Sequence, residues 1–177
     1  MLSVPNIMQE TINFSNEKKI NIALVGCGRI SKNHIKAIAQ NKDRAKLIAI
    51  CDTDSNRLSK AQTIINETFK ESITNLNEPK KFTSYLDLIE SSRKGITPLD
   101  LIVLTTPSGL HAEQVISAAN AGINVCTEKP MATTWIDGVK MVQSCKNSCV
   151  QLFVVKQNRF NSTLQLVKKQ LKKGRFG

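Results

Sequence analysis

Apolar residues in this chain gather in short runs that alternate with stretches of helical spacing. The first run lies at 20–25, where four of six residues are large and apolar and a glycine follows. A nearly continuous apolar run of this length is typical of a strand buried on both faces of a parallel sheet. The pattern predicts further strands at 46–51, 99–105, 123–127 and 151–155, and a short one beginning at Phe82.

The segments between these strands predict helices. Apolar residues recur at helical spacing in the segments 29–40, 54–65, 110–121, 135–146 and 162–173. Asp54 is placed to cap its helix, and Ser84 to Asp87 has capping-box spacing ahead of another short helix. The polar stretch 67–81 is expected to be a loop. Strands alternating with helices of this length predict an α/β fold with a Rossmann-type, doubly wound parallel sheet.

A glycine turn joins the first predicted strand to the first predicted helix. Strand, Gly-Cys-Gly and helix form the context that a dinucleotide fingerprint requires, with Ser31 in place of the third glycine. The first glycine permits the tight turn, and the second lets the backbone approach a pyrophosphate at the helix N-terminus. The alternative is an ordinary strand–helix turn. The residues predicted to hold pyrophosphate are Gly26, Gly28, Arg29 and Ile30.

An acidic residue follows the second predicted strand at the position that the fingerprint expects. Asp52 lies 24 positions after Gly28, where a carboxylate accepts hydrogen bonds from the adenosine ribose hydroxyls. A carboxylate there would repel a 2′-phosphate, so the sequence favours NAD over NADP. Asp54 is a rival for this role, although capping its helix explains it better.

Composition places the chain among globular cytoplasmic proteins. Its 177 residues suit one domain, or one domain with part of another, and 41% are hydrophobic. Residues 1–17 resemble no secretory signal and are expected to be a flexible leader, and no apolar run approaches the ~20 residues of a membrane span. The five cysteines are scattered and no Cys or His pair completes a zinc site, so we expect reduced thiols and no metal.

The formal net charge of +11 is concentrated near the C-terminal end. Residues 156–177 contain seven basic side chains and no acidic one. A basic stripe without interleaved aromatic residues is a poor nucleic-acid signature. We therefore expect no nucleic-acid partner, and interpret the stripe as a solvated face or as a surface for an acidic partner or an anionic substrate.

Four segments resemble the glucose–fructose oxidoreductase/inositol dehydrogenase (Gfo/Idh/MocA) family. They are VGCGRIS, TPSGLHAE, EKPMA and FVVKQNRFN with LKKGRFG beyond it, in the order and spacing of that family. The last segment is most similar to the branch that contains UDP-N-acetylglucosaminuronate 3-dehydrogenases of bacterial surface-sugar synthesis. The resemblance covers about residues 18–177.

The resemblance implies roles for residues that follow the strands. Lys129 would contact the substrate hydroxyl being oxidised, Pro130 would aim its loop through a bond that is cis in some relatives, and Glu128 would position the cofactor ribose or the lysine loop. Thr106, Pro107 and His111 would lie near the cofactor, although His111 could equally pack at a helix start; His34 is expected to be structural.

The last predicted strand leads into a second group of implied site residues. Gln157 would contact the cofactor, and Lys156, Asn158, Arg159 and Asn161 would line the substrate cleft together with Lys129. A cationic side chain such as Arg159 could pair with a uronate carboxylate or a diphosphate. Anchoring of the final helix is the alternative role for this segment.

The resemblance also implies an antiparallel-sheet domain beyond the GRFG turn, which covers the substrate, supplies a catalytic histidine and mediates homo-oligomer formation. The sequence stops where that domain would begin, so we expect an NAD-binding domain at 18–155 and the truncated start of a second domain at 156–177. The implied reaction oxidises a nucleotide-sugar hydroxyl, at carbon 3 of a UDP-N-acetylhexosaminuronate, with NAD accepting hydride. The alternative is a non-catalytic NAD-binding pseudoenzyme or sensing module.

Overall fold

A computed structural model describes residues 18–69 and 78–176, so the leader expected at 1–17 lies outside the described residues. Six strands form one sheet in the order β3-β2-β1-β4-β5-β6, and every neighbouring pair is parallel. This order confirms the predicted Rossmann-type sheet, whose direction of winding reverses between β1 and β4. The strands are β1 (Ile20–Val25), β2 (Ala45–Cys51), β3 (Lys80–Phe82), β4 (Leu101–Leu104), β5 (Asn124–Thr127) and β6 (Leu152–Val154).

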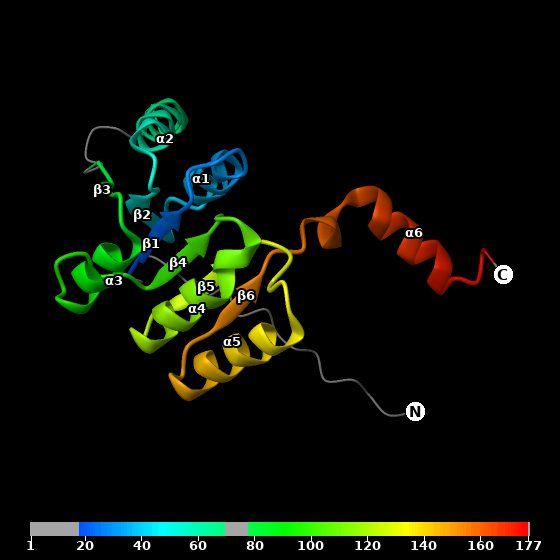
Figure 1. Cartoon of the computed structure of the whole chain (residues 1–177). Coiled ribbons are helices and arrows are strands. Elements are labelled where there is room, and N and C mark those ends of the chain that lie inside the picture. Colours follow the sequence, from blue (N-terminus) through cyan, green and yellow to red (C-terminus); the bar gives the residue numbers. More distant parts are fainter. Residues whose placement is uncertain (1–17, 70–77, 177) are drawn as a thin grey trace.

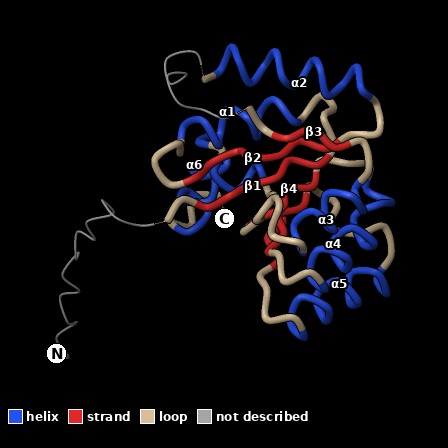
Figure 2. Tube along the Cα trace, turned by 90° about the vertical axis from the view of Figure 1, so that its left-hand side faces the viewer, coloured by secondary structure: helices blue, strands red, loops and turns tan. Residues whose placement is uncertain are grey.

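Helices cover both faces of this sheet. Figure 1 and Figure 2 show α1 and α2 on one face and α3, α4 and α5 on the other. The helices are α1 (Ser31–Gln40), α2 (Ser55–Thr68), α3 (Tyr85–Arg93), α4 (His111–Asn120), α5 (Trp135–Asn147) and α6 (Ser162–Lys172), with short 3₁₀ turns η2 (Ser108–Leu110) and η3 (Gln157–Phe160).

Two hydrophobic cores explain why the strands read as continuous apolar runs. Leu24 packs with residues of α1 and α2 such as Ile35 and Leu58. The next residue along the strand, Val25, belongs to the opposite core with Leu88 of α3. Successive strand residues point to opposite faces, so covering both faces requires apolar residues at consecutive positions.

Local capping chemistry sets several helix starts as the sequence predicts. The Asp54 carboxylate accepts a hydrogen bond from the Asn56 backbone N–H at 2.8 Å, and the Ser84 hydroxyl accepts one from the Asp87 N–H at 3.2 Å. The first helix begins later than predicted, because residues 28–30 form a turn. In that turn the Ser31 hydroxyl donates to the Gly28 carbonyl at 2.6 Å. The helix α2 extends two residues into the loop predicted at 67–81.

The last helix lies apart from the sheet (Figure 1), and no residue of α6 is buried. Its apolar side chains are exposed at Leu164, Leu166, Val167 and Leu171. Among the described residues, no helix has both the length and the apolar character needed to cross a membrane.

The ends of β1 and β4 meet at Gly26. Its φ of +92° lies in the region that L side chains rarely adopt, and a Cβ built there would lie 2.7 Å from the Thr105 carbonyl carbon. The Thr105 hydroxyl donates to the carbonyls of Val25 and Gly26, which holds the two strand ends together. Only glycine allows this approach, because any Cβ would overlap backbone atoms of Thr105 and Thr106, which follow β4.

We predict that Gly26→Ala lowers the free energy of unfolding by about 2–4 kcal/mol, because it combines backbone strain with overpacking. Gly28→Ala is the matched control, since a Cβ at Gly28 meets no atom within 4 Å. Its effect should stay below about 1 kcal/mol. Urea denaturation followed by circular dichroism measures both values, and equal losses would contradict the crowding at Gly26.

Candidate functional site

The predicted site residues gather at the carboxyl ends of the strands, where the strand order reverses. The Gly26 N–H donates to the Cys51 carbonyl at 2.7 Å, so the glycine turn is held against the end of β2. The helix α1 then begins at Ser31 with neither a side-chain cap nor an acidic residue in its first turn. The Ser31 and Asn33 N–H groups bond to carbonyls of the turn, and the positive dipole end of the helix suits a pyrophosphate.

Asp52 connects the end of β2 to the glycine turn. The residue is 8% exposed; Oδ2 accepts from the Cys27 N–H at 2.7 Å and Oδ1 accepts from the Asp54 N–H at 2.9 Å. A carboxylate oxygen has more than one acceptor position, so both oxygens retain capacity for ribose hydroxyls. Asp52 therefore orders the turn itself, and its contact with ribose stays a prediction.

The thiols of Cys27 and Cys51, the two cysteines beside Asp52, are unreactive at neutral pH. Burial, with a further contribution from the Asp52 carboxylate, raises the pKa of both Cys27 and Cys51 to about 12. Both side chains are therefore protonated thiols at neutral pH, which are poor nucleophiles. The described cysteines are all free.

The lysine loop, residues 128–130, follows β5. The Glu128 N–H donates to the Leu104 carbonyl at 3.1 Å, and the Lys129–Pro130 peptide bond is cis. The Lys129 side chain is exposed and lines a cavity of about 340 Å³ together with Lys156, Gln157, Asn158 and Arg159. The structure thus brings together four of the five predicted substrate residues and places Gln157 with them.

Asn161 does not line this cavity. Its side-chain oxygen accepts from the Leu164 N–H at 3.2 Å and caps α6. The anchoring alternative therefore fits Asn161 better than substrate contact does. An amide oxygen has a second acceptor position and the amide nitrogen can still donate, so the contact of Asn161 with substrate stays a prediction.

His111 lies behind the lysine loop and has no exposed surface. Its Nδ1 is 3.0 Å from the Pro130 carbonyl oxygen and its Nε2 is 3.0 Å from the Thr106 carbonyl oxygen. A neutral imidazole carries one N–H, so the ring donates a hydrogen bond to only one of these two carbonyl oxygens. The complete burial of the ring favours packing at the helix start, and its contact with the cofactor stays a prediction. The Thr106 hydroxyl in turn donates to the Gln114 side chain at 2.6 Å, while Pro107 is exposed before η2.

Sequence reasoning missed a contact between His34 and Glu128. His34 Nε2 lies 2.8 Å from Glu128 Oε1, and the two side chains are only 17% and 14% exposed. The second carboxylate oxygen accepts from the Lys129 N–H at 3.3 Å. The Glu128 side chain is therefore directed toward α1 and its own loop. In the sequence, the one feature that points to this contact is a histidine placed one turn into the helix that follows the glycine turn.

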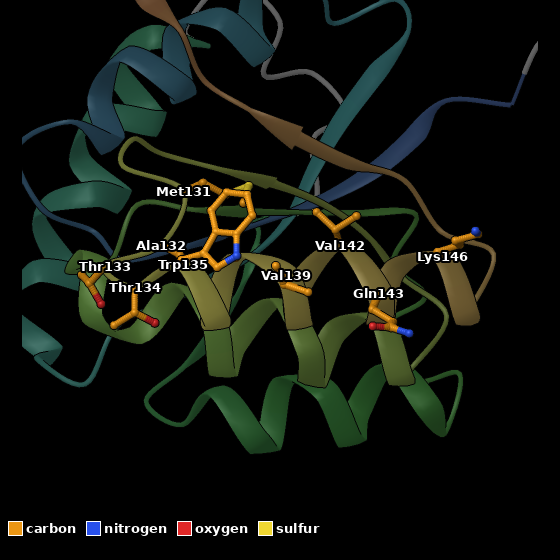
Figure 3. A pocket seen from close by; sticks show the side chains of 10 residues that line it. Met131, Ala132, Thr133, Thr134, Trp135, Val139, Val142, Gln143 and Lys146 are labelled. Carbon is orange, nitrogen blue, oxygen red and sulfur yellow. The ribbon is translucent and has the colours of Figure 1, made fainter.

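A larger, mostly apolar cavity of about 690 Å³ lies along α5 and contains none of the predicted site residues. Figure 3 shows Trp135, Val139 and Val142 lining it, and Trp135 is 86% exposed. Among the described residues, no group of three or more His, Cys, Asp or Glu side chains is placed to hold a metal ion.

The sheet order, the glycine turn and the uncapped start of α1 define a dinucleotide-binding α/β domain. Comparison with known families agrees: the Gfo/Idh/MocA family, described as an oxidoreductase family with an NAD-binding Rossmann fold, matches residues 20–156. The chain belongs to this family, and its cofactor is NAD.

Individual relatives cover most of this chain but less than half of their own length. D-apiose dehydrogenase of Paraburkholderia graminis is 30% identical over 90% of this chain and 38% of that protein. The WlbA dehydrogenase of Bordetella pertussis, solved with NADH and UDP-GlcNAcA, is 49% identical over 90% of this chain and 44% of its own, with a TM-score of 0.76. The WlbA dehydrogenase of Chromobacterium violaceum, solved with the same two ligands, is 41% identical over 100% of this chain and 44% of its own, with a TM-score of 0.74.

We predict that His111→Phe lowers the free energy of unfolding by about 1–3 kcal/mol, because a ring is kept but a buried carbonyl oxygen loses its donor. Leu110→Ala is the control, since Leu110 is 45% exposed beside it and should change stability by less than about 1 kcal/mol. Thermal unfolding of both variants checks this, and a His111→Phe variant as stable as the parent would refute the role of these contacts.

Proposed function

We propose that this chain is the cofactor-binding part of a dehydrogenase that oxidises a nucleotide-sugar hydroxyl, with NAD accepting hydride. The most specific form of the proposal is oxidation at carbon 3 of a UDP-N-acetylhexosaminuronate. Identities of 49% and 41% to WlbA structures holding NADH and UDP-GlcNAcA support this choice of substrate.

The cavity at Lys129 is the observation that carries the proposal. Three of its five lining residues, Lys129, Lys156 and Arg159, are basic, and the other two carry amide side chains. Cationic groups pair strongly with carboxylate and phosphate oxygens, which a UDP-sugar acid has at two separate places. Amides donate and accept, which suits sugar hydroxyls.

Each part of the chain has a distinct task in this proposal. NAD supplies the acceptor for the hydride when it is bound. The glycine turn and the start of α1 hold the pyrophosphate, and Asp52 accepts from the ribose hydroxyls. Lys129 Nζ contacts the reacting hydroxyl and takes or relays its proton, so that loss of proton and hydride leaves a ketone.

The segment 156–177 is proposed to begin a second domain that covers the substrate. Its helix α6 has no buried residue and an exposed set of apolar side chains, which supports burial against further protein in the working enzyme. Homo-oligomer formation is proposed for the working enzyme on the same grounds.

We predict that the chain binds NADH at least about tenfold more tightly than NADPH, a difference of about 1.4 kcal/mol. The Asp52 carboxylate would repel the 2′-phosphate. Asp52→Asn keeps a side-chain acceptor and removes the charge, so it should narrow the difference. Fluorescence titration measures the affinities of the parent chain and of Asp52→Asn for NADH and for NADPH. Equal binding of both cofactors to the parent chain would contradict the proposed contact of Asp52 with the ribose.

We predict that Lys129→Ala leaves NADH binding intact and removes at least about 10²-fold of any UDP-sugar-dependent reduction of NAD, because the proton acceptor is lost. Lys140→Ala, on α5 and outside the cavity, is the matched control. The assay mixes protein, NAD and UDP-N-acetylglucosaminuronate and follows NADH absorbance. Retained turnover in Lys129→Ala would exclude Lys129 from the reaction.

The same assay tests the alternative of a non-catalytic NAD-binding module. That alternative predicts NADH binding by the parent chain without any sugar-dependent change in absorbance. Failure to bind NADH at all would overturn both functions.

A further inference from the structure

The lysine loop is held from two directions by the two histidines of the chain. On one side of Lys129, the Glu128 side chain meets His34 of α1 at 2.8 Å. On the other side, the Pro130 carbonyl meets His111, the first residue of α4, at 3.0 Å. The helices α1 and α4 lie on opposite faces of the sheet (Figure 1), so the two contacts approach the loop from opposite faces.

The contact with His34 has the features of a specific hydrogen bond. A carboxylate only accepts, so the proton of this bond lies on His34 Nε2. The pair is largely shielded from water, with 17% and 14% of the side chains exposed. The second Glu128 oxygen accepts from the Lys129 backbone N–H at 3.3 Å. The carboxylate thus links the α1 histidine to the main chain of the residue proposed to act on substrate.

We propose that His34 is a positioning residue for Lys129, acting through Glu128, with His111 holding the opposite side of the loop. His34 lies one turn into α1, the helix whose N-terminus is proposed to hold pyrophosphate. The path from the start of α1 through His34 and Glu128 to Lys129 therefore sets the backbone from which the Lys129 side chain extends at a fixed place relative to the proposed dinucleotide site. This purpose rests on the proposed function, whereas the ordering of the loop does not.

Positioning of this kind has a large effect on rate. A misplacement of about 1 Å in a reacting group can cost about 10²-fold in turnover. Without a partner, the Glu128 side chain could change rotamer, and the Lys129 backbone would then lose the hydrogen bond that holds it. The contact with a histidine on a packed helix removes that freedom.

The deciding experiment measures backbone order at Lys129 by ¹⁵N relaxation in the cofactor-free chain. In the parent we expect an order parameter close to about 0.85, and in His34→Leu a fall below about 0.6. Leucine keeps a helix former at this position and removes the donor. The Ile102 amide, in the buried strand β4, is the internal reference and should not change.

His34→Gln is the matched variant, because its amide nitrogen reaches about where Nε2 lies and can donate to Glu128. It should restore the order at Lys129, which a loss of helix packing alone would not allow. An ordered Lys129 amide in His34→Leu would overturn the proposal. So would disorder that spreads to Ile102 or that persists in His34→Gln.

NADH titration of the same variants separates this inference from the proposed function. Absence of NADH binding in the parent would end the proposed function, while the order parameters would still decide the role of His34. If NADH binds, it should shift the Gly28 amide resonance in every variant, and the Lys129 resonance should respond as in the parent only when His34 or Gln is present.

Discussion

The approach of β4 to the glycine turn is the constraint on which the rest of the site depends. The Gly26 backbone lies so close to Thr105 that no side chain fits between them, and the Thr105 hydroxyl binds the end of β1. The Asp52 carboxylate then holds the Cys27 N–H from the side of β2. With strand ends on both sides fixed, the chain can leave β1 in only one direction. The start of α1 is therefore aimed across the carboxyl edge of the sheet.

Fixing α1 has a consequence for the lysine loop on the far side of that edge. His34 reaches Glu128 because α1 begins immediately after the turn, so this contact links the proposed pyrophosphate-binding end of α1 to the backbone of Lys129. The loop itself continues the hydrogen-bond ladder of β5 through the Glu128 N–H and the Leu104 carbonyl. Backbone pairing places the loop, and side-chain contacts with two histidines fix its orientation.

The fold was predictable from sequence because its causes are local. Apolar strands buried on both faces, caps such as Asp54 and Ser84, and a glycine turn between strand and helix all act within a few residues. The pair of His34 and Glu128 spans 94 residues, and nothing within either segment indicates the other. The role of His111 was ambiguous for the same reason. One of the carbonyl oxygens beside it belongs to Pro130 in the lysine loop and the other to Thr106, five residues before it, and only the folded chain shows both contacts. Asn161 was assigned by resemblance, while its spacing to the following helix already fitted a cap.

Most reactive side chains of the described site are buried or already hydrogen-bonded, and this favours Lys129 as the group that exchanges a proton with substrate. Cys27 and Cys51 are buried thiols whose pKa is raised to about 12, so neither supplies a thiolate near neutral pH. The His111 ring is fully buried between two backbone carbonyl oxygens, and His34 Nε2 contacts Glu128. Glu128 and Asp52 accept hydrogen bonds on both of their oxygens.

Among the titratable groups in the described part of this edge, Lys129, Lys156 and Arg159 are the ones that face the cavity. Of these, only the lysines can exchange a proton, because a guanidinium stays charged in proteins. Lys129 is the lysine whose backbone is held from both faces of the sheet, and a group that must meet a reacting hydroxyl repeatedly at one place requires such support.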